Sequence, residues 1–514
     1  MQFQVISRTQ RQPQYRGFLA LLVAEDWDDF GFRTQFNLLC RLENGEVLDI
    51  GQVKIGQFGM GPEQRRPLMP ETFAGLGEEF FSVGQDDSYY QRLDRIGRGR
   101  KAAVLTALRD IALHEDLFER ALYEDVTGTS LLRSVQRASV EGQFRRLASG
   151  GDRLSPISFS YTPPRSDATV SRLITLHFDV QPGSSPPTNI HVLIGPNGVG
   201  KTHLLNNMAR ALAEDHASQN EVGLFQNLNS DQAETGFANL VSVTFSAFDV
   251  FEPIRNRRNK ATGLQYTYVG LKRVRTAADD RPLAPKSPAA LAREFGLSVK
   301  VCLQGARLTR WRKALLTLEA DPIFCDAGVA ELAASAMEDE ELRQKASKLF
   351  RSLSSGHKIV LLTVTRLVES VEERSLVLLD EPEAHLHPPL LSAFIRALSD
   401  LLVERNGVAI IATHSPVVLQ EVPAQCSWKL RRSAGELVAE RPVVETFGEN
   451  VGVLTREVFG LEVTRSGFHQ VVREIVGSGA SYEQLVDRLD GQVGGEARAL
   501  GRGLIAAREA EVGL

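Results

Sequence analysis

Apolar residues follow two patterns along the chain. Short apolar runs at 190–194, 375–379 and 408–413 are typical of strands buried in a parallel sheet. Longer stretches, such as 201–213 and 389–404, repeat apolar residues at helical spacing. Because strand-like and helix-like segments alternate, the pattern predicts an α/β fold.

The first 150 residues show shorter strand-like runs. FRTQFNLLCRL and EVLDIGQVKIG flank Glu43, Asn44 and Gly45, and Asn-Gly favours a tight hairpin turn. Helical patterns follow in KAAVLTALRDIAL and EDLFERALYEDV. This region is therefore predicted to be a small α+β domain.

The same region contains the acidic cluster EDWDD. We interpret it as a turn rich in aspartate, because Asp side chains bond to nearby backbone groups in turns. The alternative is a metal site that includes Asp26 and Asp28, which would suit a nuclease.

Changes in composition divide the chain into five predicted segments. An N-terminal α+β domain is followed by two halves of an ATPase domain, which a basic and mostly helical insertion separates, and a helical segment ends the chain. The segments are 1–150, 151–252 (first ATPase half), 253–345 (insertion), 346–445 (second ATPase half) and 446–514.

Charge is distributed unevenly over the 514 residues, whose net charge is −5. Residues 253–313 contain 15 Lys and Arg but three acids, a net charge of +12 that leaves −17 for the rest. Such a segment could contact nucleic acid, since Lys and Arg displace counterions from phosphates. A solvated basic surface is the alternative.

Other features of the composition indicate a cytoplasmic protein. The four cysteines are far apart and form no CxxC pair, so neither a disulfide framework nor a zinc site is predicted. The start MQFQVISRTQRQ lacks the pattern of a secretory signal, and no run of 18 apolar residues occurs.

The strongest motif is a glycine-rich loop between an apolar strand and an amphipathic helix, where GPNGVGKT matches GxxxxGKT. Its glycines allow backbone N–H groups to surround phosphates, and the helix start adds its positive dipole end. Lys201 is expected to reach the β and γ phosphates of ATP, and Thr202 to bind Mg²⁺. The predicted nucleotide-binding residues are Gly195, Pro196, Asn197, Gly198, Val199, Gly200, Lys201 and Thr202.

Another apolar strand, SLVLLDEPE, ends in acidic residues and complements the glycine-rich loop. Asp380 ends a buried strand, at the edge where α/β folds bind ligands, and is expected to hold Mg²⁺. Glu381 can polarise the attacking water as a general base, and Glu383 is a weaker candidate. His385 and His387 form an HxH pair, for which packing is favoured because no third metal ligand is evident.

His414 follows the next buried strand, GVAIIATHS. An imidazole at that end of the sheet can hydrogen-bond the γ-phosphate and the attacking water. We therefore predict a catalytic role for His414, together with Glu381.

The stretch RSLSSGHKIV, residues 351–360, allows two interpretations. By itself it is typical of a helix capped by a serine. Its place between the glycine-rich loop and DEPE favours a helix whose N-terminus binds phosphate, as in the loop itself.

The set GPNGVGKT, LSSGHK, LLDEPEAHLHP and ATHSP, in this order, resembles the ABC-type ATPases. Within them it is similar to the soluble bacterial group that includes the overcoming lysogenization defect family and defence ATPases such as those of Septu. The resemblance implies a head-to-tail dimer or higher oligomer, in which the signature motif of one copy contacts the ATP held by the glycine-rich loop of another. That motif corresponds to Leu353, Ser354, Ser355 and Gly356.

Some positions depart from the family pattern. The strand NLVSVTFSAFD lacks the Gln that commonly ends it, and Ser246 or Asp249 could replace that contact. His357 stands where Gln or Glu is most frequent. Only 151 positions separate Thr202 from Leu353, which excludes long coiled-coil arms, and the C-terminal stretch lacks the DxD of a Toprim nuclease.

Three functions follow as hypotheses. The first is an ATP-dependent sensor and scaffold of an anti-phage defence or DNA-processing complex, which controls a separately encoded effector, a nuclease. The second is a stand-alone DNA-repair ATPase that resembles a RecF-like clamp. The third is a nuclease with its site around Asp26 and Asp28.

Overall fold

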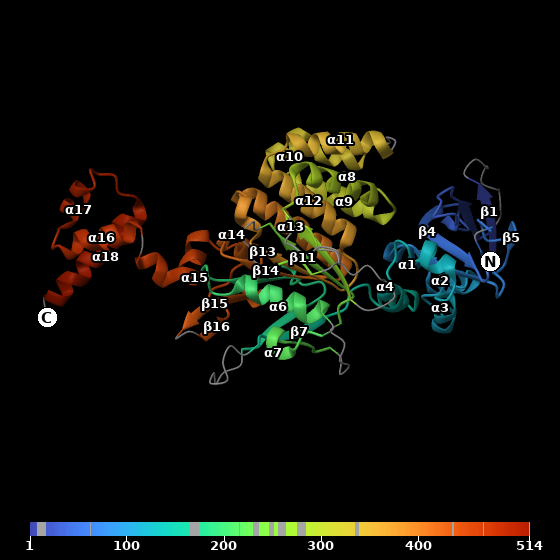
Figure 1. Cartoon of the computed structure of the whole chain (residues 1–514), viewed down its shortest axis with the longest axis horizontal. Helices are drawn as coiled ribbons and strands as arrows, with labels where there is room; N and C mark the ends of the chain where they lie inside the picture. Colours follow the sequence, from blue (N-terminus) through green and yellow to red (C-terminus); the bar gives the residue numbers. More distant parts are fainter. Residues whose placement is uncertain are drawn as a thin grey trace. The chain divides into compact units, whose positions relative to one another are not determined.

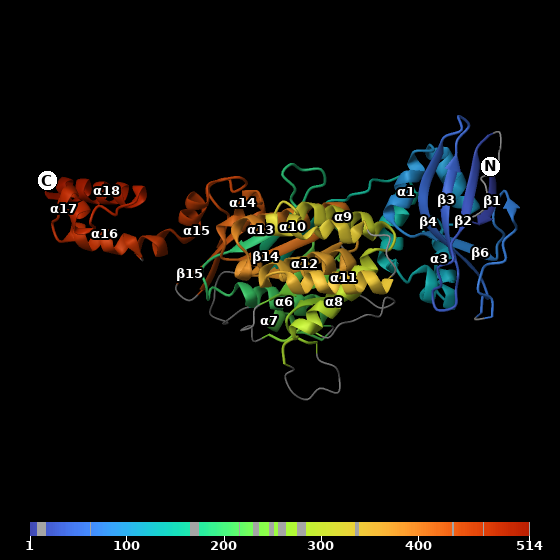
Figure 2. The ribbon, with the colours of Figure 1, turned by 90° about the horizontal axis from the view of Figure 1, so that it is seen from above.

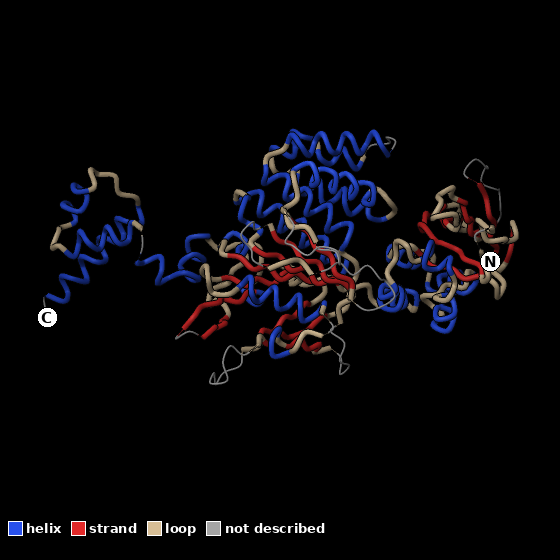
Figure 3. The backbone as a smooth tube through the Cα atoms, viewed as in Figure 1, coloured by secondary structure: helices blue, strands red, loops and turns tan. Residues whose placement is uncertain are grey.

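The computed structural model forms two compact units, the first comprising residues 1–191 and 202–412 and the second 192–201 and 413–514 (Figure 1). Strands and helices alternate as predicted for an α/β fold (Figure 3). Ser246 and Asp249 lie outside the described residues. Those residues are 1–7, 17–61, 63–164, 174–214, 216–229, 236–245, 251–254, 264–274, 284–334, 339–433, 436–465 and 467–512.

A six-stranded sheet with the order β5-β1-β2-β3-β4-β6 begins the first unit. β1 and β2 are parallel and the other neighbours antiparallel. The predicted hairpin is confirmed, since β3 and β4 pair on either side of a turn in which Gly45 has a φ of +86°. The strands are β1 (Gln2–Ser7), β2 (Leu19–Ala24), β3 (Gln35–Arg41), β4 (Val47–Gln57), β5 (Thr72–Phe73) and β6 (Phe80–Gly84).

Short helices pack against this sheet and close one large apolar core (Figure 2). Leu38, Val53 and Phe81 of the strands are fully buried there, together with Leu105 and Val126 from the helical part. The helices are α1 (Asp87–Asp94), α2 (Arg98–Ala107), α3 (Glu115–Ala121), α4 (Arg137–Ser139) and α5 (Arg145–Ala148).

Four parallel strands with the order β12-β11-β13-β14 form the central sheet of the first unit. β13 and β14 are the apolar runs noted in the sequence, and their side chains are almost all buried. The bounds are β11 (Asn239–Thr244), β12 (Gln265–Gly270), β13 (Ser375–Asp380) and β14 (Val408–Thr413).

β12 is a strand within residues 253–345, the segment expected to be a basic and mostly helical insertion. Its sequence, QYTYVG, alternates aromatic and polar residues, and Tyr266 and Tyr268 are buried while the strand adds to β11. Such alternation favours a strand. Helices begin only at Pro288.

Helices cover both sides of the central sheet (Figure 1). α8 to α13 lie on one side, where α12 contacts β11 and β12. α6 lies on the other side and shares a cavity with β11 and β13. The helices are α6 (Lys201–Ala213), α7 (Gln219–Val222), α8 (Pro288–Cys302), α9 (Ala306–Leu318), α10 (Pro322–Ala327), α11 (Asp339–Ser352), α12 (Ser355–Ser370) and α13 (Pro388–Arg405).

A small antiparallel sheet with the order β10-β7-β8 completes the first unit. Phe159 and Phe178 stack between neighbouring strands. The strands are β7 (Ile157–Thr162), β8 (Leu176–Val180) and β10 (Leu224–Asn227).

The second unit contains the end of β9 and the C-terminal part of the chain. β9 pairs in parallel with β15, and β15 pairs with β16 in a hairpin. From Val451 to Val512 the described residues are mostly helical. The elements are β9 (Ile190–Ile194), α14 (Pro416–Gln420), β15 (Ser427–Ser433), β16 (Glu436–Glu440), α15 (Val451–Arg465), α16 (Phe468–Gly477), α17 (Tyr482–Arg488) and α18 (Gly495–Val512).

The last three helices have their own small core. Val472, Val476, Leu485 and Ile505 are buried in it. Of the helices in the described ranges, none combines the length and the apolar character needed to cross a membrane.

Candidate nucleotide-binding site

The glycine-rich loop connects β9 to α6, as the sequence predicted. Gly198 and Gly200 have φ values of +78° and +107°, which other residues rarely adopt. A Cβ on Gly195 would lie 2.2 Å from the carbonyl oxygen of Leu430. Glycine is therefore required at these three positions, for backbone conformation at two and for space at one.

Lys201 is 4% exposed and is held within its own loop. Its Nζ donates to the carbonyl oxygens of Gly195, at 2.9 Å, and Pro196, at 3.0 Å. These bonds keep the ammonium group at the loop, where a phosphate could replace the carbonyl oxygens as its partner.

Thr202, the next residue, lines a cavity of about 50 Å³ together with Asp380. Asp380 ends β13, between Thr244 of β11 and Ala412 of β14. A threonine hydroxyl and a carboxylate are oxygen ligands of the kind that Mg²⁺ prefers, with phosphate oxygens and water supplying the rest. The predicted pair of metal ligands is thus brought together and fits Mg²⁺.

Glu381 has an unusual backbone conformation. Its φ of +45° and ψ of +58° lie in the left-handed region, Pro382 follows it, and its N–H donates to the carbonyl of Ala412 at 2.9 Å. Non-glycine residues in this region cost of the order of 1 kcal/mol and cluster at functional sites. The conformation supports a specialised role for the Glu381 carboxylate.

The signature stretch forms the start of α12. Ser354 is its N-cap, as one of the two interpretations predicted, and Leu353 is buried behind it. Ser354 and Ser355 are exposed. A Cβ on Gly356 would lie 2.3 Å from the carbonyl oxygen of His385, so the helix start packs directly on the loop that follows Asp380 and Glu381.

His357 belongs to a chain of hydrogen-bonding side chains. Its Nδ1 lies 2.6 Å from the Ser354 hydroxyl and its Nε2 lies 3.0 Å from one oxygen of Asp321. The other oxygen of Asp321 lies 3.3 Å from Nε2 of His387. Asp321 thus connects the signature helix to the loop after Glu381.

Asp321 was not predicted as a site residue, because its sequence context is that of an ordinary helix cap. It caps α10, accepting from the N–H groups of Ile323 and Phe324. Burial acts to raise the pKa of the Asp321 carboxyl, but the hydrogen bond from His357 and the bonds from α10 lower the pKa below its ordinary value. The carboxylate therefore stays charged in contact with both histidines.

His414 directly follows β14, and Thr413 Oγ1 accepts from the N–H of Ser415 at 2.9 Å. Since β13 and β14 are parallel with Asp380 beside Ala412, the chain reaches His414 two residues after this pair. His414 thus follows the carboxyl end of its strand, where the sequence predicted it.

The acidic cluster near the N-terminus forms a turn rich in ion pairs. Arg66 contacts Asp26 at 2.6 Å, Arg65 contacts Asp28 at 2.6 Å, and Asp28 accepts from the N–H of Gly31. In the described part of the chain, no group of three or more His, Cys, Asp or Glu could hold a metal ion. The cluster therefore has the contacts of the predicted turn.

Several residues of the basic segment form ion pairs inside the first unit. Arg307 contacts Glu372 at 3.0 Å, and Arg310 contacts Asp86 at 2.9 Å. Two lysines are paired in the same way, Lys286 with Glu294 and Lys313 with Glu404. Of the 15 basic residues, Arg255, Arg257, Arg258, Lys260, Arg275 and Arg281 lie outside the described residues.

The strand, GxxxxGKT loop and helix, followed by an acid-ended parallel strand, are the elements of a P-loop ATPase. Residues 315–420, which include the signature stretch, Asp380 and His414, match the family described as "AAA domain, putative AbiEii toxin, Type IV TA system". The chain is 42% identical over 532 residues to Protein ea59 of Escherichia phage lambda, covering 99% of both chains. It therefore belongs to the family of Protein ea59.

Two solved structures are more distantly similar. An inward-facing conformation of a "putative metal-chelate type ABC transporter" is 18% identical, covers 59% of this chain and 89% of its own, and has a TM-score of 0.30. The ADP conformation of MJ1267, an ATP-binding cassette of an ABC transporter, is 12% identical and covers 60% and 99%, with a TM-score of 0.31.

Proposed function

We propose that the chain is an ATP-hydrolysing switch subunit that closes around ATP as a head-to-tail dimer or higher oligomer. The proposal rests on the positions of four residues in the first unit. Thr202 and Asp380 share one cavity, whereas the exposed serines Ser354 and Ser355 begin α12 and line no part of that cavity. A helix start with two hydroxyl groups suits the phosphates of a nucleotide. In this proposal a second copy of the chain supplies that nucleotide.

Each side chain has a distinct role in the proposed reaction. The loop N–H groups and Lys201 bind the phosphates, and Thr202 and Asp380 bind Mg²⁺, which neutralises phosphate charge. Glu381 accepts a proton from the attacking water, and His414 donates a hydrogen bond to the γ-phosphate. The signature helix of the second copy adds N–H and hydroxyl donors as charge develops on the transferred phosphoryl group.

We further propose that the subunit acts as the sensor and scaffold of an anti-phage defence or DNA-processing complex, in which it controls a separately encoded nuclease. The resemblance of the ordered motif set to defence ATPases supports this assignment. Co-purification of the product of an adjacent gene, dependent on ATP, is the expected result. An ATPase stimulated by DNA without any such partner would instead favour the stand-alone repair ATPase.

Replacing Glu381 with Gln tests the assembly. The amide keeps the size of the side chain but cannot accept the proton, so ATP should bind without being hydrolysed and hold two copies together. We expect the Glu381→Gln variant to elute at twice the monomer mass in light-scattering chromatography with ATP and Mg²⁺, and its ATP turnover to fall at least 100-fold.

Glu383→Gln is the matched control, because it makes the same change two residues further along. It should hydrolyse ATP and show no trapped dimer. A Glu381→Gln protein that binds ATP and stays monomeric would contradict the proposed dimer.

A further inference from the structure

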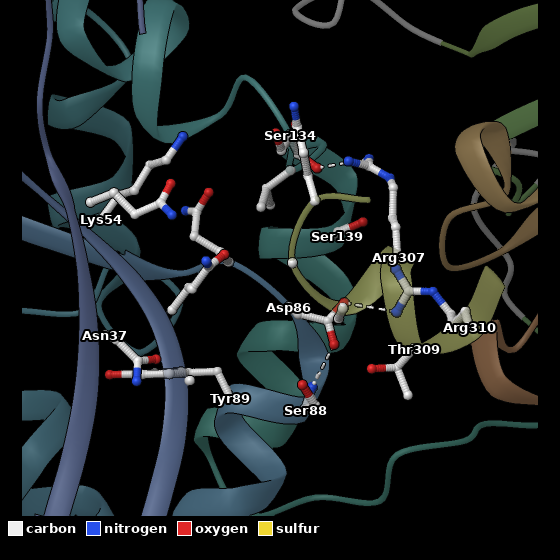
Figure 4. Close-up of a pocket in the computed structure, with 18 of the residues that line it drawn as sticks. Asn37, Lys54, Asp86, Ser88, Tyr89, Ser134, Ser139, Arg307, Thr309 and Arg310 are labelled. Carbon is white, nitrogen blue, oxygen red and sulfur yellow. Dashed lines mark hydrogen bonds and ion pairs between the residues drawn. The ribbon is translucent and has the colours of Figure 1, made fainter. Parts of the chain in front are cut away.

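A polar cavity of about 410 Å³ lies within the first unit, away from the glycine-rich loop in sequence (Figure 4). One wall consists of β3, β4 and α1 of the N-terminal sheet region. The other is formed by α9 and the turn before it, with Arg307 and Arg310 facing Ser134 and Asp86. Cavities of this size are typical of sites for small molecules.

A network of buried ion pairs between side chains connects the two walls. Arg310 pairs with Asp86 at 2.9 Å, and Arg405 pairs with Asp87 at 3.2 Å and also with Glu372. Burial, and next the charge of Asp86, raises the pKa of Asp87 to about 6. Because the lining arginines already neutralise these carboxylates, the cavity does not require a cationic ligand.

Several polar groups of the lining have no partner among the described residues. Gln52 of β4 and Gln304 before α9 line opposite walls of the cavity, and neither carboxamide makes a hydrogen bond with the described residues. The Tyr89 and Ser139 side chains are 1% and 2% exposed, and both hydroxyl groups lack a partner. Buried polar groups normally have a partner, so the hydroxyl groups of Tyr89 and Ser139 indicate that a polar ligand completes the site, to which the half-buried Gln52 and Gln304 add further hydrogen-bonding groups.

Two further lining residues define the chemistry of that ligand. Arg92 is exposed, forms no ion pair among the described residues, and lies near Gly51, where a Cβ would be 3.6 Å from Nη1. Trp27 is 39% exposed and is fixed by a 2.9 Å hydrogen bond from Nε1 to Asp29. An unpaired guanidinium binds an anionic group, and an exposed indole offers a flat face for stacking.

We propose that this cavity binds a small anionic molecule with a planar, hydrogen-bonding ring, which is the chemistry of a mononucleotide. The carboxamides of Gln52 and Gln304 can each donate and accept, as the edge of a nucleobase requires. Arg92 binds the phosphate, and Trp27 stacks on the base. The site is separate from the glycine-rich loop and is built mainly from residues that the ATPase motifs do not include.

The position of the cavity also connects it to the ATPase centre. Arg307 and Arg405 of the lining both hold Glu372, which lies three residues before β13, and β13 ends at Asp380. A ligand that changes the contacts of these arginines therefore changes the support of the strand that carries Asp380. This regulatory role rests on the proposed ATPase function, whereas binding to the cavity does not.

Binding is tested with the full-length Lys201→Ala variant, whose weakened glycine-rich loop reduces binding at the ATP site. We expect AMP, GMP, CMP or UMP to give a saturable calorimetric titration and to change the fluorescence of Trp27. Gln52→Ala and Arg92→Ala should each raise the Kd about tenfold, the effect of losing one good hydrogen bond or ion pair. Trp27→Phe should remove the fluorescence change.

Arg100→Ala is the matched control, because Arg100 is a half-buried arginine of α2 that pairs with Glu43 outside the cavity. It should leave the Kd unchanged. Absence of binding by all four nucleotides at millimolar concentration, or binding unaffected by Gln52→Ala and Arg92→Ala, would overturn the proposal. If inorganic phosphate bound the cavity as tightly as the mononucleotides, the proposal that the site recognises a planar ring would be overturned. Absence of ATPase activity in every assay would contradict the proposed function but would not affect the binding of mononucleotides to the cavity.

Discussion

At the scale of single residues, the arrangement around His357 gives a physical role to a side chain that departs from the family pattern. A Gln or Glu at the third position of a helix can return a hydrogen bond to the N-cap. His357 instead contacts the Ser354 hydroxyl with one ring nitrogen and the buried carboxylate of Asp321 with the other. The signature serine is therefore oriented by a residue 33 positions before it in the chain.

Replacing His357 tests this contact. His357→Leu removes both hydrogen bonds and leaves the Asp321 carboxylate with one fewer partner, so we expect a loss of about 2 kcal/mol in the free energy of unfolding. His357→Gln keeps one polar contact and should lose less. Urea denaturation of both variants measures the difference, and equal stability of wild type and His357→Leu would contradict the described contact.

At the scale of elements, α12 and the loop after β13 form one packed unit. Gly356 lies against the carbonyl of His385, and His387 shares Asp321 with the signature helix. The signature stretch and the acidic strand are thus coupled within one chain. In the proposed function, α12 therefore contacts both the nucleotide of the second copy and the loop that follows Glu381.

A methyl group at Gly356 should separate the two elements. In Gly356→Ala the Cβ would collide with backbone, which cannot move aside like a flexible side chain, and we expect a loss of about 1 to 3 kcal/mol in stability and reduced ATP turnover. Thermal unfolding and an ATPase assay measure both. Gly460→Ala, in α15, is the control, because a Cβ there meets nothing within 4 Å. Equal behaviour of the two variants would contradict the coupling.

At the scale of the whole molecule, the positive charge of residues 253–313 is partly used for internal ion pairs. Arg307 and Arg310 bind acids of the first unit, whereas Arg293 and Arg312 are exposed. A large local charge in a sequence therefore overstates the charge that a partner can reach. Contact with nucleic acid through this segment is a proposal that depends on its exposed residues.

We expect the protein to bind duplex DNA with an affinity that falls steeply as salt rises. The double variant Arg293→Glu, Arg312→Glu should weaken binding and reduce the slope of log K against log salt by roughly two. Arg396→Glu, an exposed arginine of α13 outside the segment, is the control. Fluorescence anisotropy at several salt concentrations measures these slopes. Binding that is unaffected by the double variant would exclude these two residues from the interface.

Local patterns predicted the features that depend on neighbouring residues. The glycine-rich loop, the strand that ends at Asp380, the cap at Ser354 and the β3–β4 hairpin each depend on a few consecutive side chains, whose backbone preferences are readable in sequence. The strand β12 was not predicted, because it lies within a segment whose most evident feature is positive charge, which does not indicate secondary structure, although QYTYVG alternates as a strand does.

The sequence by itself determined the P-loop ATPase class, because phosphate and Mg²⁺ binding require particular residues at fixed spacing along a strand, a loop and a helix. Only the tertiary structure decided that Asp321 joins His357 to His387, and that Gln52 and Gln304 line one cavity. These residues are far apart in the chain. Their contacts arise from the packing of helices on a sheet, which no local pattern encodes.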